Sequence, residues 1–575
     1  MAEEHLNTAF GAFGALDAVA RRCMEGFAFF QRLTNAPESV DDFRIRLDLQ
    51  QAKLAVWVQE WGIGSGGQHL KDRRFQAHEA AVSKHLDLIY RITNDLRSID
   101  VNIPAPSRAP NSIPMDTLPR FHRLGLGNPF GLKSPTTNLL DPEAANSASS
   151  NSSLTTTESL KWAWHDEKSN ERLHNLADLI RDLYDFLPPP YLDPAGIVVM
   201  GTSLASSDSK TLARVGKALD LDQEPLLAGL AQMKSIGYRT QASIRSAQLH
   251  ASQLLPLRQG EKFLRFMATY EGSLVFVEQK HSTVSPKFQN QRAVLRARIE
   301  NIVLRLQDSR IPAELRTLPC RGIVVDELVN DDSTITSTYS IVYRTESPRF
   351  FSLRQIFSQQ GKSKQEIQQA KDRLSLGRRF LIAKALSRAV IYLHNADWLH
   401  KAIRSENILF FVETMADLAS ALPYLVGFEY SRPDALGEQT EHMTQKEEHK
   451  FYRHPKALAV PVADLNQPLG GGGTYSKVFD IYSFGVVLVE LGLFISARGI
   501  VETYMGSKAN PTSEEIRNLL LEKAIPKLRF LTGEIYANAA RVCLDGHFDQ
   551  FGRESQALHT AFYNNCVRQL DLCRA

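Results

Sequence analysis

The sequence predicts a multidomain protein in which an all-α helical bundle precedes an α+β domain. Apolar residues recur at helical spacing through much of residues 1–235, whereas β-rich runs first occur after residue 270. A long helical part follows these runs, an order typical of an α+β domain. Because 575 residues exceed what one hydrophobic core usually holds, we predict separate domains at 1–235 and 241–575.

Three apolar stripes predict the helices of the first domain. Within each stripe the spacings are three, four or seven residues, so its members share one face of a helix. The stripes are Phe43, Leu47, Leu54, Trp57 and Trp61; Val82, Leu86, Ile89, Ile92 and Leu96; and Leu173, Leu176, Ile180, Leu183 and Leu187. Residues 103–159, between the second and third stripes, are rich in proline, serine and threonine, so we predict a disordered insertion there.

The N-terminal segment LNTAFGAFGALDAVA carries a single charge, at Asp17. Phe10, Phe13 and Leu16 fall on one helical stripe within it. The segment is too short and too interrupted to span a bilayer permanently. Two interpretations stay open: a buried helix of the bundle, or a candidate membrane segment that is buried at rest and enters a bilayer once released.

Composition excludes several functional classes. Lys and Arg number 67 against 64 Asp and Glu, so the chain lacks the basic excess usual in nucleic-acid-binding proteins. The five scattered cysteines show no CxxC spacing, and the acidic start MAEEH is unlike a signal peptide. We therefore expect a cytoplasmic protein without a disulfide framework, and no resident metal.

The second domain is predicted to have two lobes. β-rich runs occur at 272–280, 320–328 and 338–346, and a helical run at 292–307 separates the first two. A long helix over 376–394 follows, and the remainder is mostly helical in pattern. A small strand-rich lobe followed by a helical lobe is a bilobal α+β arrangement.

The segment LHKAIRSENILFF resembles the catalytic loop of protein kinases, whose pattern is H-R-D-L-x-x-x-N. His400 and Asn407 match the His and the metal-binding Asn of that pattern. Lys401 stands for the Arg, and Arg404 stands in the position of the loop lysine. Ala402 occupies the position of the catalytic Asp.

Two further motifs follow in the order expected for a kinase. In LVGFEYSR, Gly427 takes the Asp position of D-F-G, Phe428 keeps the Phe, and Glu429 replaces the Gly. In YRHPK, Lys456 replaces the Glu of A-P-E, and KVFDIYSFGVVLVEL resembles the kinase helix that begins with a structural Asp, here Asp480. Together the motifs predict a bilobal protein-kinase-like domain.

The substitutions predict a pseudokinase with no catalytic residue. A methyl group at Ala402 cannot accept a proton from a substrate hydroxyl, and Gly427 brings no carboxylate for Mg²⁺. Asn407 alone does not build a productive Mg²⁺ site, so any ATP would bind without one. For the ATP lysine of the third strand the sequence leaves two candidate positions open, Lys280 and Glu278.

Residues 1–230 resemble the fungal HeLo domain, a family named for heterokaryon-incompatibility and prion-propagation proteins. The resemblance rests on the Gly/Ala/Phe-rich start and on the segments FRIRLDLQQAKLAVWVQEWG and ESLKWAWHDEKSNERLHNLADLIRDL. It implies a helical bundle whose N-terminal helix acts on membranes when activated, and a role in self/non-self recognition or programmed cell death.

The order of the two domains is similar to that of the mixed-lineage kinase domain-like family. This similarity implies a pseudokinase that restrains the bundle, protein partners, self-oligomerisation and association with the plasma membrane on activation. Two alternatives remain: a weakly active protein kinase that uses Lys280 and Asn407, and a scaffold without membrane activity.

Overall fold

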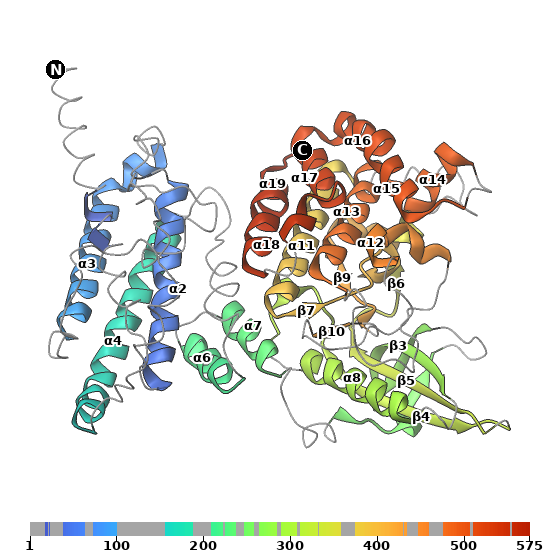
Figure 1. Ribbon diagram of the computed structural model, residues 1–575, viewed down its shortest axis with the longest axis horizontal. Helices are drawn as coiled ribbons and strands as arrows, with labels where there is room; N and C mark the ends of the chain where they lie inside the picture. The colour runs from blue at the N-terminus through green and yellow to red at the C-terminus, as the bar shows by residue number, and fades with distance from the viewer. Residues whose placement is uncertain are drawn as a thin grey trace, which may run out of the picture. The chain divides into compact units, whose positions relative to one another are not determined.

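The computed structural model shows two units, of which each is described by itself (Figure 1). The first comprises Met1–Ser207 and Ala213–Glu224, and the second comprises Asp208–Leu212 and Pro225–Ala575. The structure describes residues 18–20, 22–23, 38–61, 63, 73–99, 156–187, 209–221, 225–236, 247–257, 264–284, 289–307, 311–331, 333–357, 374–428, 431–433, 447–458, 475–506, 510–551 and 555–575.

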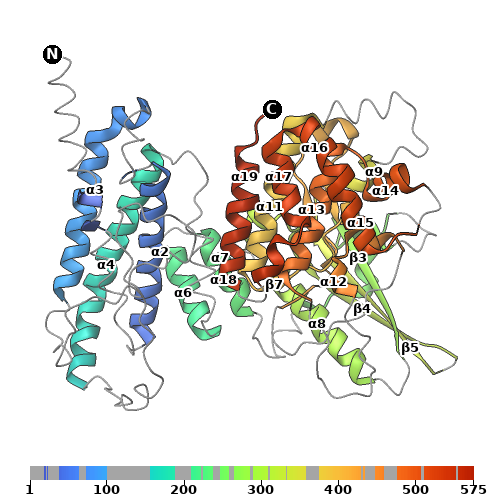
Figure 2. The same ribbon diagram turned by 45° about the horizontal axis from the view of Figure 1, so that its top comes forward.

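The first unit is built on three long helices that lie side by side, α2 (Glu38–Glu60), α3 (Arg73–Ile99) and α4 (Thr156–Phe186) (Figures 1 and 2). A shorter helix, α6 (Ser209–Leu221), spans the division between the units. The three apolar stripes meet in one core, as predicted; its fully buried members include Leu54, Trp57, Val82, Leu86, Ile89, Leu173, Leu176, Ile180 and Leu183. The all-α character of the first domain is therefore confirmed.

The end of α4 is fixed by two indole groups, one on α2 and one directly after it. The Nε1 atoms of Trp57 and Trp61 both donate to the carbonyl of Leu187, at 2.9 and 3.3 Å. Because an indole N–H buried without an acceptor is costly, this shared carbonyl satisfies both groups where Pro188 ends the helix. Phe75 of α3 packs against Trp61 with ring centroids 5.5 Å apart.

Two features predicted for the first domain lie outside the described residues: the stripe of Phe10, Phe13 and Leu16, and the insertion up to residue 155. The end of the predicted insertion is corrected, because α4 begins at Thr156 and residues 156–159 are therefore helical. Within the segment that starts at residue 6, the described residues 18–20 are helical, and Ala20 is buried in the bundle core.

The second unit contains a five-stranded antiparallel sheet of order β1-β2-β3-β5-β4 (Figure 1). Helix α8 (Gln289–Gln307) joins β3 to β4 and packs against the sheet, with Ile299 and Val303 buried. The strands are β1 (Leu254–Pro256), β2 (Arg265–Tyr270), β3 (Ser273–Val284), β4 (Cys320–Val329) and β5 (Ile335–Arg344), preceded by η8 (Ala251–Gln253), with η10 (Ala313–Leu315) before β4.

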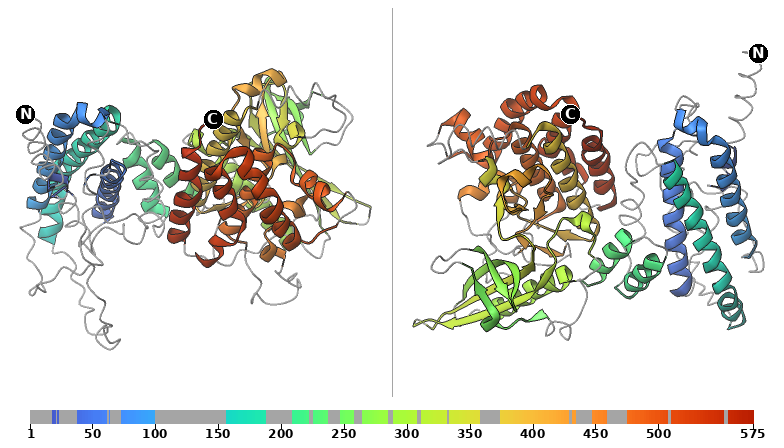
Figure 3. Two further views of the ribbon diagram at one scale, coloured as in Figure 1. Left: turned by 90° about the horizontal axis from the view of Figure 1, so that it is seen from above. Right: turned by 180° about the vertical axis from the view of Figure 1, so that it is seen from behind.

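A helical part follows the sheet and holds short strands at its border with it (Figure 3). Its first half comprises β6 (Phe350–Ser352), α9 (Leu353–Phe357), α11 (Leu376–Asn395), β7 (Trp398–Leu399), η11 (Ser405–Asn407), β8 (Ile408–Phe411), η12 (Met415–Ala419), β9 (Tyr424–Leu425), β10 (Arg432–Pro433), η14 (Glu447–Tyr452) and α12 (Pro455–Leu458). Its second half comprises α13 (Lys477–Leu493), α14 (Ala497–Met505), α15 (Ser513–Leu519), η15 (Leu520–Ala524), α16 (Ile525–Thr532), α17 (Glu534–Leu544), η16 (His547–Phe551), α18 (Ser555–Phe562), η17 (Tyr563–Val567) and α19 (Arg568–Leu572). The α+β character of the second domain is confirmed.

Helix α13 is the centre of this helical part. It is buried on all sides, and Gly485 allows α17 to pack closely, since a Cβ there would lie 2.7 Å from Cβ of Cys543. Tyr536 of α17 donates to the carbonyl of Leu488 at 2.9 Å. Over the described ranges no single helix has the length and apolarity to cross a bilayer, although α13 and α14 meet these criteria together across a 75° bend.

Helix α7 (Pro225–Ile236) packs with the second unit, whereas the sequence places its residues in the first domain. A shared carboxylate fixes it there: Asp397 lies 2.6 Å from Nζ of Lys234 and 2.8 Å from Nζ of Lys477. Both lysines are nearly inaccessible. Burial raises the pKa of Asp397, but Lys477 and Lys234 outweigh burial, so the net pKa lies below its ordinary value.

Candidate functional site

The loop that carries the kinase-like motif is anchored by Asp480, in the first turn of α13. Its carboxylate accepts hydrogen bonds from the backbone N–H groups of His400 and Lys401, both at 2.8 Å, and from the hydroxyl of Tyr475 at 2.9 Å. These donors hold Lys401 at φ +66°, a left-handed conformation that a non-glycine residue adopts at a cost. Asp480 thus fixes the shape of the loop.

Hydrogen bonds oppose the effect of burial on the pKa of Asp480. Complete burial raises this pKa, but the hydrogen bonds from His394 and from the backbone N–H of His400, together with the electrostatic effect of both imidazoles, lower it by more. The net pKa of this fully buried carboxyl group therefore lies below its ordinary value.

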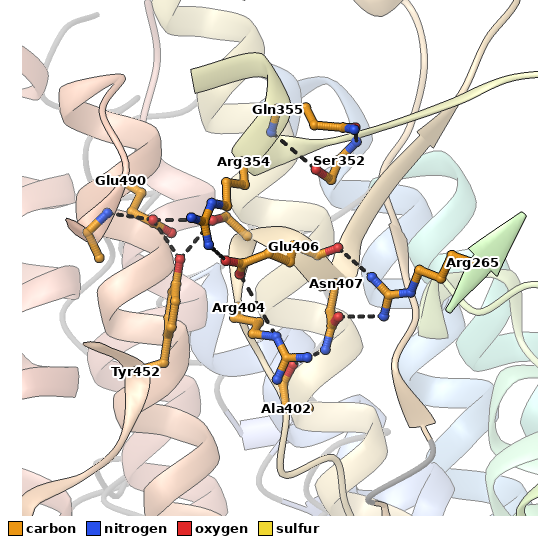
Figure 4. Close-up of polar contacts among 12 residues, drawn as sticks. Arg265, Ser352, Arg354, Gln355, Ala402, Arg404, Glu406, Asn407, Tyr452 and Glu490 are labelled. Atoms are coloured by element: carbon orange, nitrogen blue, oxygen red, sulfur yellow. Dashed lines mark hydrogen bonds and ion pairs between the residues drawn. The ribbon is translucent and has the colours of Figure 1, made fainter. Parts of the chain in front are cut away.

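Asn407 ends the loop, and both polar atoms of its side-chain amide form hydrogen bonds within the protein (Figure 4). Its Nδ2 atom donates to the carbonyl of Ala402 at 2.7 Å. Its Oδ1 atom accepts from Nη2 of Arg265 at 2.6 Å. The guanidinium of a β2 residue therefore occupies the oxygen side of the Asn407 amide.

Arg265 also joins the sheet to the loop. Its Nε atom lies 2.9 Å from Oε1 of Glu278, its direct partner across the β2–β3 hairpin. Its Nη1 atom donates to the carbonyl of Glu406 at 2.8 Å (Figure 4). The other oxygen of Glu278 accepts from the backbone N–H of Gly427 at 3.1 Å. The Arg265 and Glu278 pair thus connects β2 and β3 to the loop with Asn407 and to the segment with Gly427.

Of the two β3 candidates, Glu278 accepts a hydrogen bond from the Gly427 segment. It is only 4% exposed. Lys280 lies two residues further on the same face, opposite Tyr339 of β5, and is also buried. The acidic residue of α8, Glu300, pairs with Arg296 at 2.9 Å on its own helix.

Gly427 is the tightest point of the site. Its φ is +89°, and a Cβ built there would lie 2.3 Å from Nδ2 of Asn407. No side chain fits at this position while Asn407 keeps its place. The next residue, Phe428, is buried and packs edge-on against His400, with ring centroids 4.6 Å apart. Glu429 lies outside the described residues.

A second polar network connects the loop to the segment before α12 (Figure 4). The hydroxyl of Tyr452 contacts the hydroxyl of Ser405 at 2.7 Å and donates to Oε1 of Glu490 at 2.7 Å. The same oxygen accepts from the backbone N–H of Ala497 at 2.7 Å. Burial raises the pKa of Glu490 to about 8, although these donors oppose the rise.

Charged contacts flank the network on both sides. Arg354 of α9 pairs with Glu406, whose other oxygen lies 3.9 Å from Nε of Arg404 (Figure 4). Lys456, at the A-P-E-like position, pairs with Asp549 of η16 at 2.7 Å. In the described part of the chain, no group of three or more His, Cys, Asp or Glu side chains could hold a metal ion.

Sequence reasoning missed Arg265, Tyr452 and Glu490. A signal for Arg265 exists: the two-residue turn Glu271-Gly272 fixes the hairpin register and puts residue 265 opposite Glu278. The contact of Arg265 with Asn407 spans 142 positions of sequence, and no local pattern reports it. Tyr452 and Glu490 lie in different motifs, and only the fold brings them together.

Comparison with known proteins bears on the first unit. Residues 8–195 match the family model HeLo, described as prion-inhibition and propagation. A search of curated proteins found no match. The match is confined to the bundle and covers about a third of the chain. The resemblance of the N-terminal region to the HeLo domain is thereby confirmed over residues 8–195.

Proposed function

We propose that the second unit is a protein-kinase-like regulatory domain without phosphoryl transfer, and that it controls a HeLo-type bundle acting in fungal incompatibility or programmed cell death. The observation that carries the proposal is the contact of Arg265 with Asn407. If Asn407 corresponds to the metal-binding asparagine of kinases, as the motif resemblance implies, this contact supports the proposal, because a guanidinium then stands at the oxygen that a divalent cation would need.

The order of elements supports the kinase-like assignment. A five-stranded antiparallel sheet with one described α-helix between β3 and β4 precedes a helical part, and the loop with His400 and Asn407 follows α11, the first long helix of that part. Asp480 binds this loop through backbone N–H groups, a role suited to a structural residue. Resemblance of motif and arrangement of elements point to the same fold.

Three features support the loss of catalysis. Ala402 supplies no general base, which is typically worth roughly 10²–10⁴ in rate. Gly427 supplies no carboxylate, and its contact with Asn407 excludes one sterically. The guanidinium of Arg265 repels a cation at Oδ1 of Asn407, because like charges a few ångströms apart cost several kcal/mol at protein-like dielectric, about 4 at 4 Å and ε ≈ 20.

The HeLo match supports the assignment of the bundle to incompatibility or cell death, as the resemblance implies. In the proposed mechanism the second unit restrains the bundle, a protein signal releases it, copies associate, and the N-terminal segment enters the plasma membrane. The cytoplasm is the resting location in this scheme, and nucleic acid is not a partner.

Thermal denaturation of the full chain with ATP, with and without Mg²⁺, tests the loss of catalysis. We expect no Mg²⁺-dependent shift of the melting temperature, because Arg265 occupies Oδ1 of Asn407 and residue 427 carries no carboxylate. A shift that requires Mg²⁺ and disappears in Asn407→Ala would refute the proposal and favour a weakly active kinase.

Expression in cells tests the control of the bundle. We expect the 1–224 fragment to kill cells, the full chain to do so only after activation, and deletion of residues 1–30 to abolish killing by the fragment. Undiminished killing after this deletion contradicts the membrane role. A fragment that kills no cells and releases no liposome contents favours a scaffold.

A further inference from the structure

The turn between α16 and α17 exposes three large apolar side chains close together in sequence. Phe530 is 87% exposed, Leu531 44% and Ile535 43%. Gly533, at φ +87° with open space around it, forms the turn between the two helices. We call Phe530, Leu531 and Ile535 the apolar tip; in Figure 1, α16 lies at the upper edge of the second unit.

Basic side chains continue the same face toward the N-terminal end of α16. Lys527 precedes Phe530 and Leu531 by three and four residues, so the three share one face, and Lys523 lies one turn earlier. Both lysines are exposed, and neither forms an ion pair with any residue that the structure describes. Nearby, Arg529 neutralises Glu534 at 2.9 Å.

The apolar tip does not take part in packing α16 onto the second unit. The buried residues Ile525, Leu528 and Thr532, on the opposite face of α16, pack it against α13 and α17. A phenylalanine left almost fully in water beside two exposed lysines matches the pattern of surfaces that enter a lipid interface: aromatic and aliphatic groups for the acyl boundary and cations for the headgroups.

We propose that the apolar tip with Lys523 and Lys527 binds the surface of an anionic phospholipid bilayer. The inference is independent of the proposed function, because it concerns the second unit and not the bundle. A second copy of the chain is a poorer occupant: the three side chains expose on the order of 350 Å², taking about 200 Å² for each whole side chain, whereas a stable interface needs about 800 Å² from each partner. A bilayer requires no matched shape.

The lysines supply the charge complementarity for this choice. Each basic residue near a surface of anionic lipid contributes attraction, which salt screens within a Debye length. Binding through the tip is therefore expected to require an anionic lipid, and to weaken when NaCl is raised.

Site-specific fluorescence on the full chain tests the proposal without interference from the bundle. All five native cysteines are buried, so a single cysteine at position 531 accepts an environment-sensitive dye while Phe530 and both lysines remain. The matched control is the same dye attached to Leu381→Cys. Leu381 is also exposed, at 51%, but it lies on α11, outside the apolar tip.

With vesicles of phosphatidylcholine and phosphatidylserine, we expect a blue shift of the dye at Leu531→Cys and none at Leu381→Cys. Phosphatidylcholine alone gives no shift. When Phe530→Ser, or Lys523→Glu with Lys527→Glu, is added to Leu531→Cys, the lipid concentration that gives half of the blue shift rises at least tenfold. These residues are exposed, so circular dichroism and the melting temperature stay unchanged.

A dye at position 531 that stays in water while the chain sediments with the same vesicles overturns the proposal, since binding then uses another surface. A response that persists in Phe530→Ser also overturns it. A concentration-dependent shift in the absence of vesicles indicates a second copy instead. None of these outcomes bears on killing by the bundle, so failure here is distinct from failure of the proposed function.

Discussion

Replacing Arg265 by methionine removes the guanidinium that joins the sheet to the loop while keeping most of the side-chain volume. The carboxylate of Glu278, 4% exposed, then loses its partner at 2.9 Å. At an effective dielectric near 20 the gross attraction of such a pair is about 6 kcal/mol, and the desolvation of both charges offsets much of it. We expect a net loss of about 1–3 kcal/mol, because contacting charges usually couple by this amount.

Hydrogen exchange measured by mass spectrometry localises this loss. The backbone N–H of Gly427 donates to Glu278, and that of Val426 donates to the carbonyl of Asn407 at 2.9 Å, so peptides over 425–428 report the opening of the site. A loss of 1–3 kcal/mol corresponds to roughly 5- to 150-fold faster exchange there. Peptides of α17 serve as the internal reference.

The matched control is Arg292→Met. Arg292 contacts Glu327 at 3.7 Å, and both side chains are about a third exposed, so this pair is expected to contribute less than about 1 kcal/mol. In Arg265→Met combined with Glu278→Gln, part of the loss is recovered, since the uncompensated buried charge is gone. Equal effects of Arg265→Met and Arg292→Met on exchange and melting would refute the reasoning.

Three further predictions follow from buried charge and close packing. Asp397→Asn leaves two buried lysines without their shared anion, and we expect about 3 kcal/mol of destabilisation of the second unit in thermal denaturation, with Asp326→Asn, an exposed carboxylate, as a near-neutral control. The pKa of Glu490, about 8 in the folded state, exceeds its unfolded value of 4.5. The contribution of protonated Glu490 to the free energy of unfolding is therefore fully present below pH 4.5 and is lost as pH rises to 8, by about 1.4 kcal/mol per pH unit. Glu490→Gln should therefore gain stability relative to the wild type across this window in urea denaturation; a constant difference contradicts the raised pKa. Gly427→Ala should cost about 2 kcal/mol or more in the same assay, because its Cβ would lie 2.3 Å from Nδ2 of Asn407, and an unchanged free energy of unfolding would show that Asn407 yields easily.

The sequence predicted the helices of the bundle because their apolar stripes have a fixed period. Leu173 to Leu187, for example, all face the core, as the spacing requires. The anchoring role of Asp480 was also within reach, since a motif carries it. The domain boundary was harder: α7 is apolar enough for either domain, and only the pairing of Lys234 with Asp397 shows where it packs.

The contacts around Asn407 and Gly427 could not be predicted from the motifs alone. The motifs identify residues 402, 407 and 427 as a group of interest, but they do not indicate what contacts them. Those contacts come from Arg265 and Glu278, two residues of a β-hairpin that the fold brings to Asn407 and to Gly427 respectively. Local patterns describe one segment at a time, whereas these contacts join strand and loop across a large separation in sequence.

The close contact between Gly427 and Asn407 makes position 427 dependent on residues of other segments. An aspartate at 427 cannot be accommodated until Asn407 moves, and Asn407 is held by Arg265 and by the carbonyl of Ala402. A larger side chain at 427 therefore costs stability unless Asn407 or Arg265 changes as well, so substitutions at these three positions are expected to be tolerated only together.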